Sequence, residues 1–381
     1  MNTLKLHKLG IDIGSTTVKI AILDEQNTLV FSDYERHFAN IRETLTDLLH
    51  KAYEKLGQIQ LCPMITGSGG LTLAKHLDVP FVQEVIAVST ALQDAAPQTD
   101  VAIELGGEDA KIIYFEGGNV EQRMNGICAG GTGSFIDQMA SLIQTDASGL
   151  NEYAKNYKAI YPIAARCGVF AKTDIQPLLI QGADRADIAL STFHAIAKQT
   201  IGRLAQGLEI TRPVVFEGGP LTFNPVLVQV FAQRLELKEE EVLIPPRPEL
   251  MVACGAAVSA DTMFDGEPCS PAPLLELLRS GQLRTREGGD GPARPFFASE
   301  EERAAFAARN KKHTLEWKVP KPGEEVCAYL GIDSGSTTTK FVLMDDREEL
   351  LGSFYAPNGG EPLNVAKRAL IESVKRCGGE I

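Results

Sequence analysis

The stretch LGIDIGSTTVKIAILD, residues 9 to 24, decides the fold because it sets a short turn of glycine and hydroxyl residues between two apolar segments. Apolar, β-branched segments on either side of such a turn predict two paired strands, and LVFSDYERHF predicts a third. Nearly the same stretch, LGIDSGSTTTKFVLMD, returns at residues 330 to 345. The chain therefore starts one module twice, and we expect the second copy to contain a strand pair, a third strand and one helix.

Helical and strand periodicities alternate between the two copies, which predicts a mixed α/β protein. Further strands are expected at LCPMITGS, on both sides of the turn in VAIELGGEDAKIIYF, and at residues 213–216. Helices are expected at residues 40–57, 70–77, 83–96, 131–144, 184–210 and 248–263. Residues 265–326 are rich in glycine, proline and charge, so we interpret them as a linker or peripheral excursion with helical patches at 273–283 and 299–312.

Composition and charge exclude several classes of protein. The 381 residues are 44% hydrophobic and 23% charged, which is typical of a globular protein with two or three domains. A formal net charge of -13 argues against general nucleic-acid binding, which needs a basic surface. No apolar run reaches the roughly 18 residues that a membrane span needs, and residues 1–10 lack a signal-peptide core, so the cytoplasm is the expected location.

The seven cysteines are scattered, odd in number and free of close CxxC pairs. They do not form a disulfide framework, and in a reducing compartment most are expected to be small core residues. An exception has to be argued from its surroundings.

The first glycine turn carries the residues Asp12, Gly14, Ser15, Thr16, Thr17 and Lys19. A tight turn between two strands can direct backbone N–H groups and hydroxyls at an anion, and Asp12 can hold a metal-bound water. A single motif of this kind is more often a hydrophilic hairpin turn, so it needs support from a second one.

The second turn has the same form, with Glu104, Gly106, Gly107, Glu108 and Asp109 between two strands. Its acids are suited to organising Mg²⁺ and a nucleophilic water, and two matching turns favour phosphate binding over plain hairpins. A third turn, Gly218, Gly219 and Pro220, follows a buried strand and precedes a helix, where glycines allow an adenosine to lie against backbone.

These three turns, in this order, resemble the superfamily of actin, sugar kinases, acetate kinase and heat-shock ATPases. The resemblance implies two duplicated ribonuclease-H-like lobes with ATP or ADP and Mg²⁺ in the cleft between them. We expect lobe I at residues 1–97, lobe II at 98–264, a linker or peripheral helices at 265–327, and the start of a second, truncated ATPase module at 328–381.

Two cysteine motifs narrow the family. Cys128 begins CAGGTG, which contains Gly131 and Thr132, and Cys167 lies in RCGVFA. Over residues 9–261 the chain resembles the iron-sulfur activators of 2-hydroxyacyl-CoA dehydratases and the ATPase subunits of benzoyl-CoA reductases, in their long, double-module branch. The resemblance implies that Cys128 and Cys167 ligate a 4Fe-4S cluster shared between two modules, with Gly131 and Thr132 in the cofactor site. Cys128 would precede one helix and Cys167 another, beginning at Thr173 or Asp174, and helix N-termini favour thiolates.

The implied function is an ATP-hydrolysing activator that passes a low-potential electron from ferredoxin or flavodoxin to a partner dehydratase or reductase. Asp12, Glu108 and Asp109 are the expected catalytic residues. Glu104 and Glu108 replace the Asp and Gln of the short activators, which leaves the water-positioning residue open. The second module or a second copy of the chain would complete the cluster. Two alternatives remain: a sugar or small-metabolite kinase with structural cysteines, and a non-catalytic nucleotide-dependent scaffold.

Overall fold

The structure is a computed structural model that describes residues 5–116, 119–125, 130–164, 167–280, 295–311, 317–321, 323–335 and 337–376. It divides into two compact units. The first unit comprises residues 1–174 and 184–283, and the second comprises residues 175–183 and 284–381.

The first sheet is built from the stretch that opens the chain. Strands β1 (Leu6–Ile13), β2 (Thr17–Leu23) and β3 (Leu29–Arg36) are antiparallel neighbours, and β4 (Gln60–Thr66) joins β1 in parallel, giving the order β3-β2-β1-β4. Helices α1 (Ile41–Leu56) and α2 (Gly70–Leu77) cover the sheet at the predicted positions. Every residue of β1 from Leu9 to Ile13 is buried, because α10 packs against one face of this central strand and the lobe I core against the other.

The second sheet repeats this arrangement. Strands β5 (Val101–Leu105), β6 (Ala110–Glu116) and β7 (Asn119–Met124) are antiparallel neighbours, β8 (Val214–Glu217) joins β5 in parallel, and β9 (Val242–Leu243) extends the edge. The order β7-β6-β5-β8 therefore matches β3-β2-β1-β4. Two lobes with the same topology confirm the predicted fold class, the duplicated ribonuclease-H-like fold.

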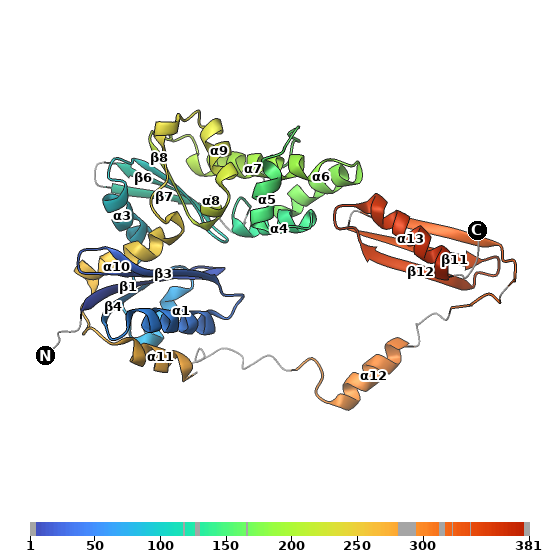
Figure 1. The fold of residues 1–381 in the computed structure, drawn as a ribbon, viewed down its shortest axis with the longest axis horizontal. Helices are drawn as coiled ribbons and strands as arrows, with labels where there is room; N and C mark the ends of the chain where they lie inside the picture. The colour runs from blue at the N-terminus through green and yellow to red at the C-terminus, as the bar shows by residue number, and fades with distance from the viewer. Residues whose placement is uncertain are drawn as a thin grey trace. The chain divides into compact units, whose positions relative to one another are not determined.

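Lobe II carries more helices than the sequence predicted. Helices α4 (Gly133–Leu142) and α7 (Arg185–Thr200) are at expected positions, whereas α5 (Ala147–Ala154), α8 (Gly219–Phe223) and α9 (Pro225–Arg234) are additional (Figure 1). The helix expected to reach residue 210 ends earlier: α7 continues as a π-helix at Ile201–Ala205, and Gln206 then adopts a left-handed conformation. Helix α6 (Gly168–Ile180) begins at Gly168, so the expected start at Thr173 or Asp174 was wrong.

Helices α3 (Glu84–Ala95) and α10 (Met251–Met263) connect the two lobes. A single buried cluster joins Met64 of β4 to Ala102 of β5 and Ile113 of β6 through apolar residues of both helices. The two helices touch closely: a Cβ added to Gly255 would lie 1.8 Å from the carbonyl oxygen of Ala87. Figure 1 shows α10 between the two sheets. The lobes therefore share a core in which a shift of one helix is felt by both sheets.

The described residues of the segment expected to be a linker or peripheral helices contain two helices. Helix α11 (Pro271–Arg279) contributes Leu274, Leu275 and Leu278 to the core of lobe I, and Cys269 forms a β-bridge with Leu61. Helix α12 (Glu300–Lys311) has no buried residue.

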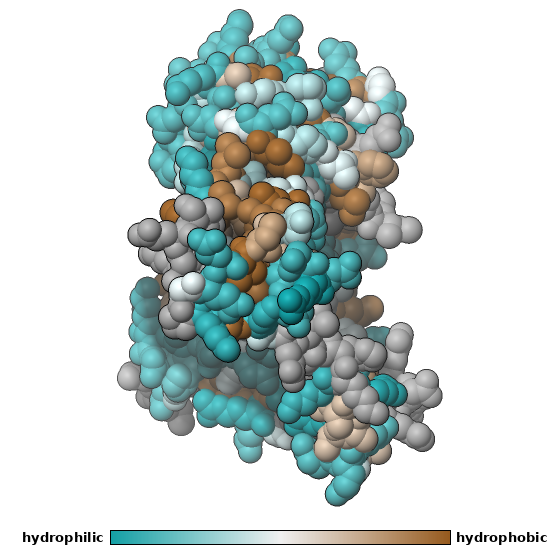
Figure 2. Space-filling model, turned by 90° about the vertical axis from the view of Figure 1, so that its right-hand side faces the viewer, coloured by the Kyte–Doolittle hydropathy of each residue, from teal (hydrophilic) through white to brown (hydrophobic). Residues whose placement is uncertain are grey.

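The second unit contains β10 (Ala328–Ser334), β11 (Thr338–Asp345), β12 (Leu350–Pro357) and α13 (Pro362–Arg376), in the sheet order β10-β11-β12. Its register repeats that of the first copy, because Gly331 pairs with Val342 as Gly10 pairs with Ala21. All residues of β10 are exposed, including Tyr329 and Ile332. Figure 2 shows apolar side chains, in brown, gathered on part of the surface that it draws.

Candidate active site

The two predicted phosphate turns have one backbone geometry. The N–H of Gly14 donates to the carbonyl of Thr17 at 2.9 Å, and the N–H of Gly106 donates to the carbonyl of Asp109 at 2.8 Å. The repeat forms the same turn, in which Gly335 donates to Thr338 at 2.9 Å. The turns that begin at Gly14, Gly106 and Gly335 therefore have the same backbone hydrogen bond.

The turns of the two lobes face each other across a narrow gap. A Cβ added to Gly107 would lie 2.1 Å from Oγ1 of Thr16, so only glycine fits there without moving the first turn. The third turn also needs its glycine. Gly218 has a φ of 93°, and a Cβ at this position would lie 2.2 Å from the carbonyl oxygen of Leu105.

All three turns line one cavity in the first unit. Seven of its lining residues were predicted to bind the nucleotide: Thr16, Thr17, Lys19, Gly106, Gly107, Gly219 and Pro220. The remainder were not predicted: Tyr34, Arg36, Gly133, Ile136, Asp137, Ala147, Phe223 and Asn224. Gly14, Ser15, Gly131, Thr132 and Gly218 shape the surrounding turns without lining this cavity. The cavity therefore takes walls from both lobes, as a nucleotide cleft requires.

Two contacts bridge the lobes beside the cavity. The guanidinium of Arg36 on β3 forms a bidentate ion pair with Asp137 on α4, at 2.7 and 3.1 Å. The rings of Tyr34 and Phe223 meet edge to face with centroids 5.5 Å apart. Both contacts join lobe I to lobe II, so they respond to any change in the angle between the lobes.

Asp12 and Lys19 form a buried ion pair on the lobe I side. Nζ of Lys19 lies 2.6 Å from Oδ2 of Asp12, and the two residues face each other across β1 and β2. Burial alone would lower the pKa of Lys19, but the Asp12 carboxylate outweighs burial and holds that pKa above its usual value. No hydrogen-bond partner among the described residues reaches Oδ1 of Asp12. This buried oxygen therefore has an unused hydrogen-bond acceptor site.

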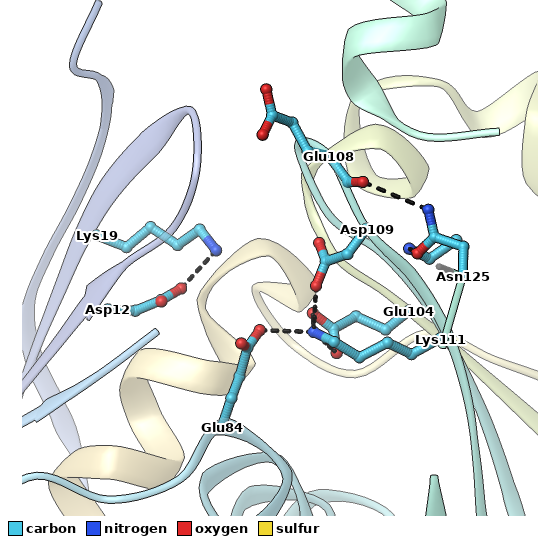
Figure 3. A network of polar contacts seen from close by, with 9 residues as sticks. Asp12, Lys19, Glu84, Glu104, Glu108, Asp109, Lys111 and Asn125 are labelled. Carbon is cyan, nitrogen blue, oxygen red and sulfur yellow. Dashed lines mark hydrogen bonds and ion pairs between the residues drawn. The ribbon is translucent and has the colours of Figure 1, made fainter. Parts of the chain in front are cut away.

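A second buried lysine lies behind the other phosphate turn (Figure 3). Nζ of Lys111 contacts Oε1 of Glu84 at 2.6 Å, Oδ2 of Asp109 at 2.8 Å and both carboxylate oxygens of Glu104 at 3.1 Å. Burial would lower the pKa of Lys111, but the three carboxylates hold it well above its usual value. Burial, reinforced by Glu104, raises the pKa of Glu84 to about 7.

Glu108 is exposed, and its carboxylate points away from Lys111 in Figure 3. Its backbone carbonyl accepts a bond from Nδ2 of Asn125 at 3.4 Å. Glu108 and Asp109 instead line a second cavity with Ser15 and Glu84. The three predicted catalytic acids thus differ in setting: Asp12 is buried, Asp109 is held by Lys111, and Glu108 faces solvent.

Glu217 precedes the third turn and is fully buried. No described residue offers a hydrogen bond to either of its carboxylate oxygens. Burial, followed by repulsion from Glu104, raises the pKa of Glu217 well above its usual value. The folded protein therefore favours the protonated form of this side chain.

Of the two predicted cluster ligands, Cys128 lies outside the described residues. Cys167 immediately precedes α6, and its carbonyl accepts the N–H groups of Phe170 and Ala171 at 3.1 and 3.3 Å. The thiol is therefore closer to a helix N-terminus than the sequence indicated. Within the described ranges, no three His, Cys, Asp or Glu side chains are arranged to hold a metal ion.

The start of α4, which follows the Cys128 motif, is bonded to the second phosphate turn. The N–H of Gly133 donates to the carbonyl of Gly106 at 2.9 Å, and the N–H of Ser134 donates to that of Gly107 at 2.7 Å. These are N–H groups that a helix start leaves without partners in its own turn. A shift of the turn is therefore passed directly to α4.

The sequence analysis missed Lys111, Glu84, Arg36 and Asp137. A spacing signal existed for the lysine, because an acid and a lysine seven residues later face each other across each hairpin: Asp12 with Lys19, Glu104 with Lys111, and Asp333 with Lys340. No local signal marks Glu84, which contacts Lys111 from another element.

Comparison with known proteins agrees with this geometry. The chain is 29% identical over 265 residues to the (R)-2-hydroxyglutaryl-CoA dehydratase activating ATPase of Acidaminococcus fermentans, covering 68% of this chain and 98% of that protein. It is also 29% identical over 260 residues to the 2-hydroxyisocaproyl-CoA dehydratase activator of Clostridioides difficile, covering 67% of this chain and 95% of the relative.

Two solved structures, one of a dehydratase component and one of a dehydratase activator, are also similar to this chain. The crystal structure of the Acidaminococcus fermentans dehydratase component A superposes with a TM-score of 0.58 at 26% identity, covering 66% of this chain and 96% of that one. The Clostridium difficile activator with bound ADPNP gives a TM-score of 0.58 at 25% identity, covering 74% of this chain and 100% of that one.

The described part of the chain contains no helix with the length and apolarity to cross a membrane. The model of one family matches residues 9–260, and the chain belongs to this family, the BadF/BadG/BcrA/BcrD ATPases.

Proposed function

We propose that this chain hydrolyses ATP in the cavity between the lobes and uses hydrolysis to drive low-potential electron transfer to a partner 2-hydroxyacyl-CoA dehydratase or related reductase. The observation that carries the proposal is the convergence of all three glycine turns, from both lobes, on one cavity. The relatives named as dehydratase activators and the relative with bound ADPNP support it.

The residues of the cavity divide by the part of the nucleotide they suit. The hydroxyls of Thr16 and Thr17, the ammonium of Lys19 and the N–H groups of the second turn suit the phosphates, where hydrogen-bond donors compensate charge. Gly219 and Pro220 suit the nucleoside, because Gly219 has no side chain and the ring of Pro220 is apolar. Mg²⁺ would supply further charge neutralisation and would be held by Asp12 and Asp109, either directly or through water.

The second part of the proposal concerns the cysteines. Cys128 and Cys167, with the same pair from a facing module or a second copy of the chain, would hold a 4Fe-4S cluster that supplies the low-potential electron. Ferredoxin or flavodoxin in the cytoplasm would be the donor. The hydrogen bonds from the start of α4 to Gly106 and Gly107 support coupling of the nucleotide to this region, since they connect the phosphate turn to the helix that follows Cys128.

For the second unit we propose that residues 328–381 start another ATPase module. The support is the repeated turn, the repeated register and the repeated acid–lysine pair.

The repeat supplies a matched control for the ATPase test. Asp12→Ala and Asp109→Ala should each lower ATP turnover by about a hundredfold or more, because both carboxylates serve charge compensation in phosphoryl transfer. Asp333→Ala removes the equivalent carboxylate of the second copy and should leave turnover within about twofold of wild type. Phosphate release measured on anaerobically purified protein gives the answer.

Wild-type turnover in both Asp12→Ala and Asp109→Ala would refute the ATPase assignment. Phosphorylation of an added sugar or small metabolite in place of phosphate release would favour the kinase. Nucleotide binding without either reaction would favour a scaffold.

A further inference from the structure

Lys111 has more acidic partners than its counterpart in lobe I. Lys19 is paired with one carboxylate, that of Asp12 across the hairpin, and this pair is buried. Lys111 has the equivalent partner, Glu104, across its own hairpin. The ammonium of Lys111 is therefore already compensated in the way that suffices for Lys19, and the contacts with Glu84 and Asp109 need another explanation.

Asp109 belongs to the phosphate turn itself, whereas Glu84 comes from outside the hairpin. Glu84 is the first residue of α3, the helix that packs against α10 in the core shared by the two lobes. Its Oε1 lies 2.6 Å from Nζ of Lys111, and the lysine side chain is only 3% exposed. Lys111 thus stands between Glu84 and Asp109, with 2.8 Å from Nζ to Oδ2 of Asp109.

The β10–β11 hairpin of the second unit shows the acid–lysine pair without additional carboxylates. Lys340 contacts Asp333 at 2.7 Å, with side-chain exposures of 43% and 64%, and no second carboxylate among the described residues reaches this lysine. The acid–lysine pair therefore forms from the hairpin alone. The additional carboxylates at Lys111 are therefore a feature of lobe II and not of the hairpin motif.

We propose that Glu84 is a positioning residue for ATP hydrolysis, which holds the ammonium of Lys111 against Asp109 and so fixes the orientation of the Asp109 carboxylate at the second phosphate turn. The inference rests on the proposed ATPase function. Because Glu84 begins an interlobe helix, the contact also ties the orientation of Asp109 to the position of α3. Preorganised charge of this kind acts on the catalytic step more than on ground-state binding.

The test is a kinetic separation of kcat from KM. Glu84→Gln keeps the size of the side chain and removes its charge, so kcat for ATP hydrolysis should fall about tenfold while KM for ATP stays within about threefold. Glu84→Asp retains a carboxylate on a shorter side chain and should recover part of the loss. Glu43→Gln is the matched control, because Glu43 is also an acid in the first turn of a helix and contacts a cation, Arg42, at 3.0 Å.

A double-mutant cycle tests the route through the lysine. If Glu84 acts only through Lys111, Glu84→Gln should change kcat by less than about twofold in a Lys111→Met background. A full tenfold loss in that background overturns the inference, as does an unchanged kcat in the single variant. Should Lys111→Met fail to fold, the kcat and KM values of Glu84→Gln against those of Glu43→Gln still decide.

The two hypotheses fail in different ways. A wild-type chain without ATP hydrolysis overturns the proposed function and this inference with it. Hydrolysis in wild type together with a normal Glu84→Gln overturns the inference alone.

Discussion

Gly10 lies where α10 crosses β1, and its substitution tests how closely the interlobe helix must approach the sheet. A Cβ added to Gly10 would lie 1.9 Å from the carbonyl oxygen of Ala253 and 2.6 Å from the backbone nitrogen of Ala257. Ordinary contacts begin at 3.4 Å, so the helix backbone would have to retreat by 3.4 − 1.9 = 1.5 Å. Backbone cannot yield as a flexible side chain does, and α10 is held from its other side by α3.

The repeat again provides the control. Gly331 occupies the same position in the second copy, and the nearest atom to its added Cβ is the carbonyl oxygen of Val342 at 3.8 Å. Overpacking a tight core costs about 1–3 kcal/mol, while alanine in a strand regains roughly 0.5–1 kcal/mol over glycine. Gly10→Ala should therefore destabilise the first unit by about 1 kcal/mol, the difference between these two opposing effects. Gly331→Ala should be neutral or stabilising by up to about 1 kcal/mol.

The two units can be followed separately in one denaturant titration of the full chain. The single tryptophan, Trp317, belongs to the second unit, so its fluorescence reports that unit. Far-ultraviolet circular dichroism mainly reports the first unit, which holds most of the helices. Gly10→Ala should shift only the dichroism transition to lower denaturant. The reasoning is refuted if Gly10→Ala unfolds at the wild-type midpoint, or if Gly331→Ala loses as much stability as Gly10→Ala.

Two further predictions address the cysteines and the buried acid. In anaerobically prepared protein, Cys128→Ser and Cys167→Ser should each lose iron, sulfide and visible absorbance while nucleotide binding is retained; a full iron content in both variants would contradict the cluster proposal. For Glu217, whose pKa is raised by burial, the folded state binds its proton more tightly than the unfolded state, so the stability of the first unit falls as pH rises above the ordinary glutamate range. Glu217→Gln should consequently raise Tm relative to wild type more at pH 8 than at pH 5, and an equal shift at both pH values would show that Glu217 does not titrate in this way.

The hairpins of this fold could be predicted from the sequence because their determinants are local. Apolar strand segments on both sides of a glycine-initiated turn specify the same backbone bond in the three hairpin turns that begin at Gly14, Gly106 and Gly335. Burial could not be predicted in the same way. Ile11 of β1 is fully buried, whereas Ile332 at the equivalent position of β10 is 55% exposed. The difference comes from β4 and α10, which cover β1 and are far from it in sequence.

The carboxylates around Lys111 show that prediction of the active site from sequence is limited in a similar way. Asp12, Asp109 and the glycines were recognisable because each lies in a turn motif, but Glu84 is 27 residues from its partner Lys111 and lies in another element. Only the packing of α3 against the interlobe core brings the two together. The start of α6 was misplaced for a different reason: Gly168 is a weak helix former, and the helix contains Pro177, so its pattern indicated a later start.

The contacts of the two phosphate turns differ in a way that bears on coupling. The first turn is bonded within its own lobe: His37 donates its backbone N–H to the carbonyl of Thr16 at 3.1 Å and contacts the carbonyl of Gly14 at 3.2 Å through Nε2. The second turn is bonded to elements that lead elsewhere, to α4 through the carbonyls of Gly106 and Gly107 and to α3 through Lys111. A nucleotide that shifts both turns equally therefore has different effects through each. Movement of the first turn is passed to few other elements, whereas movement of the second turn is passed to helices α4 and α3. Since one of those helices follows Cys128 and the other lies in the interlobe core, we expect a change of nucleotide at the second turn to reach both the proposed cluster ligands and the angle between the lobes.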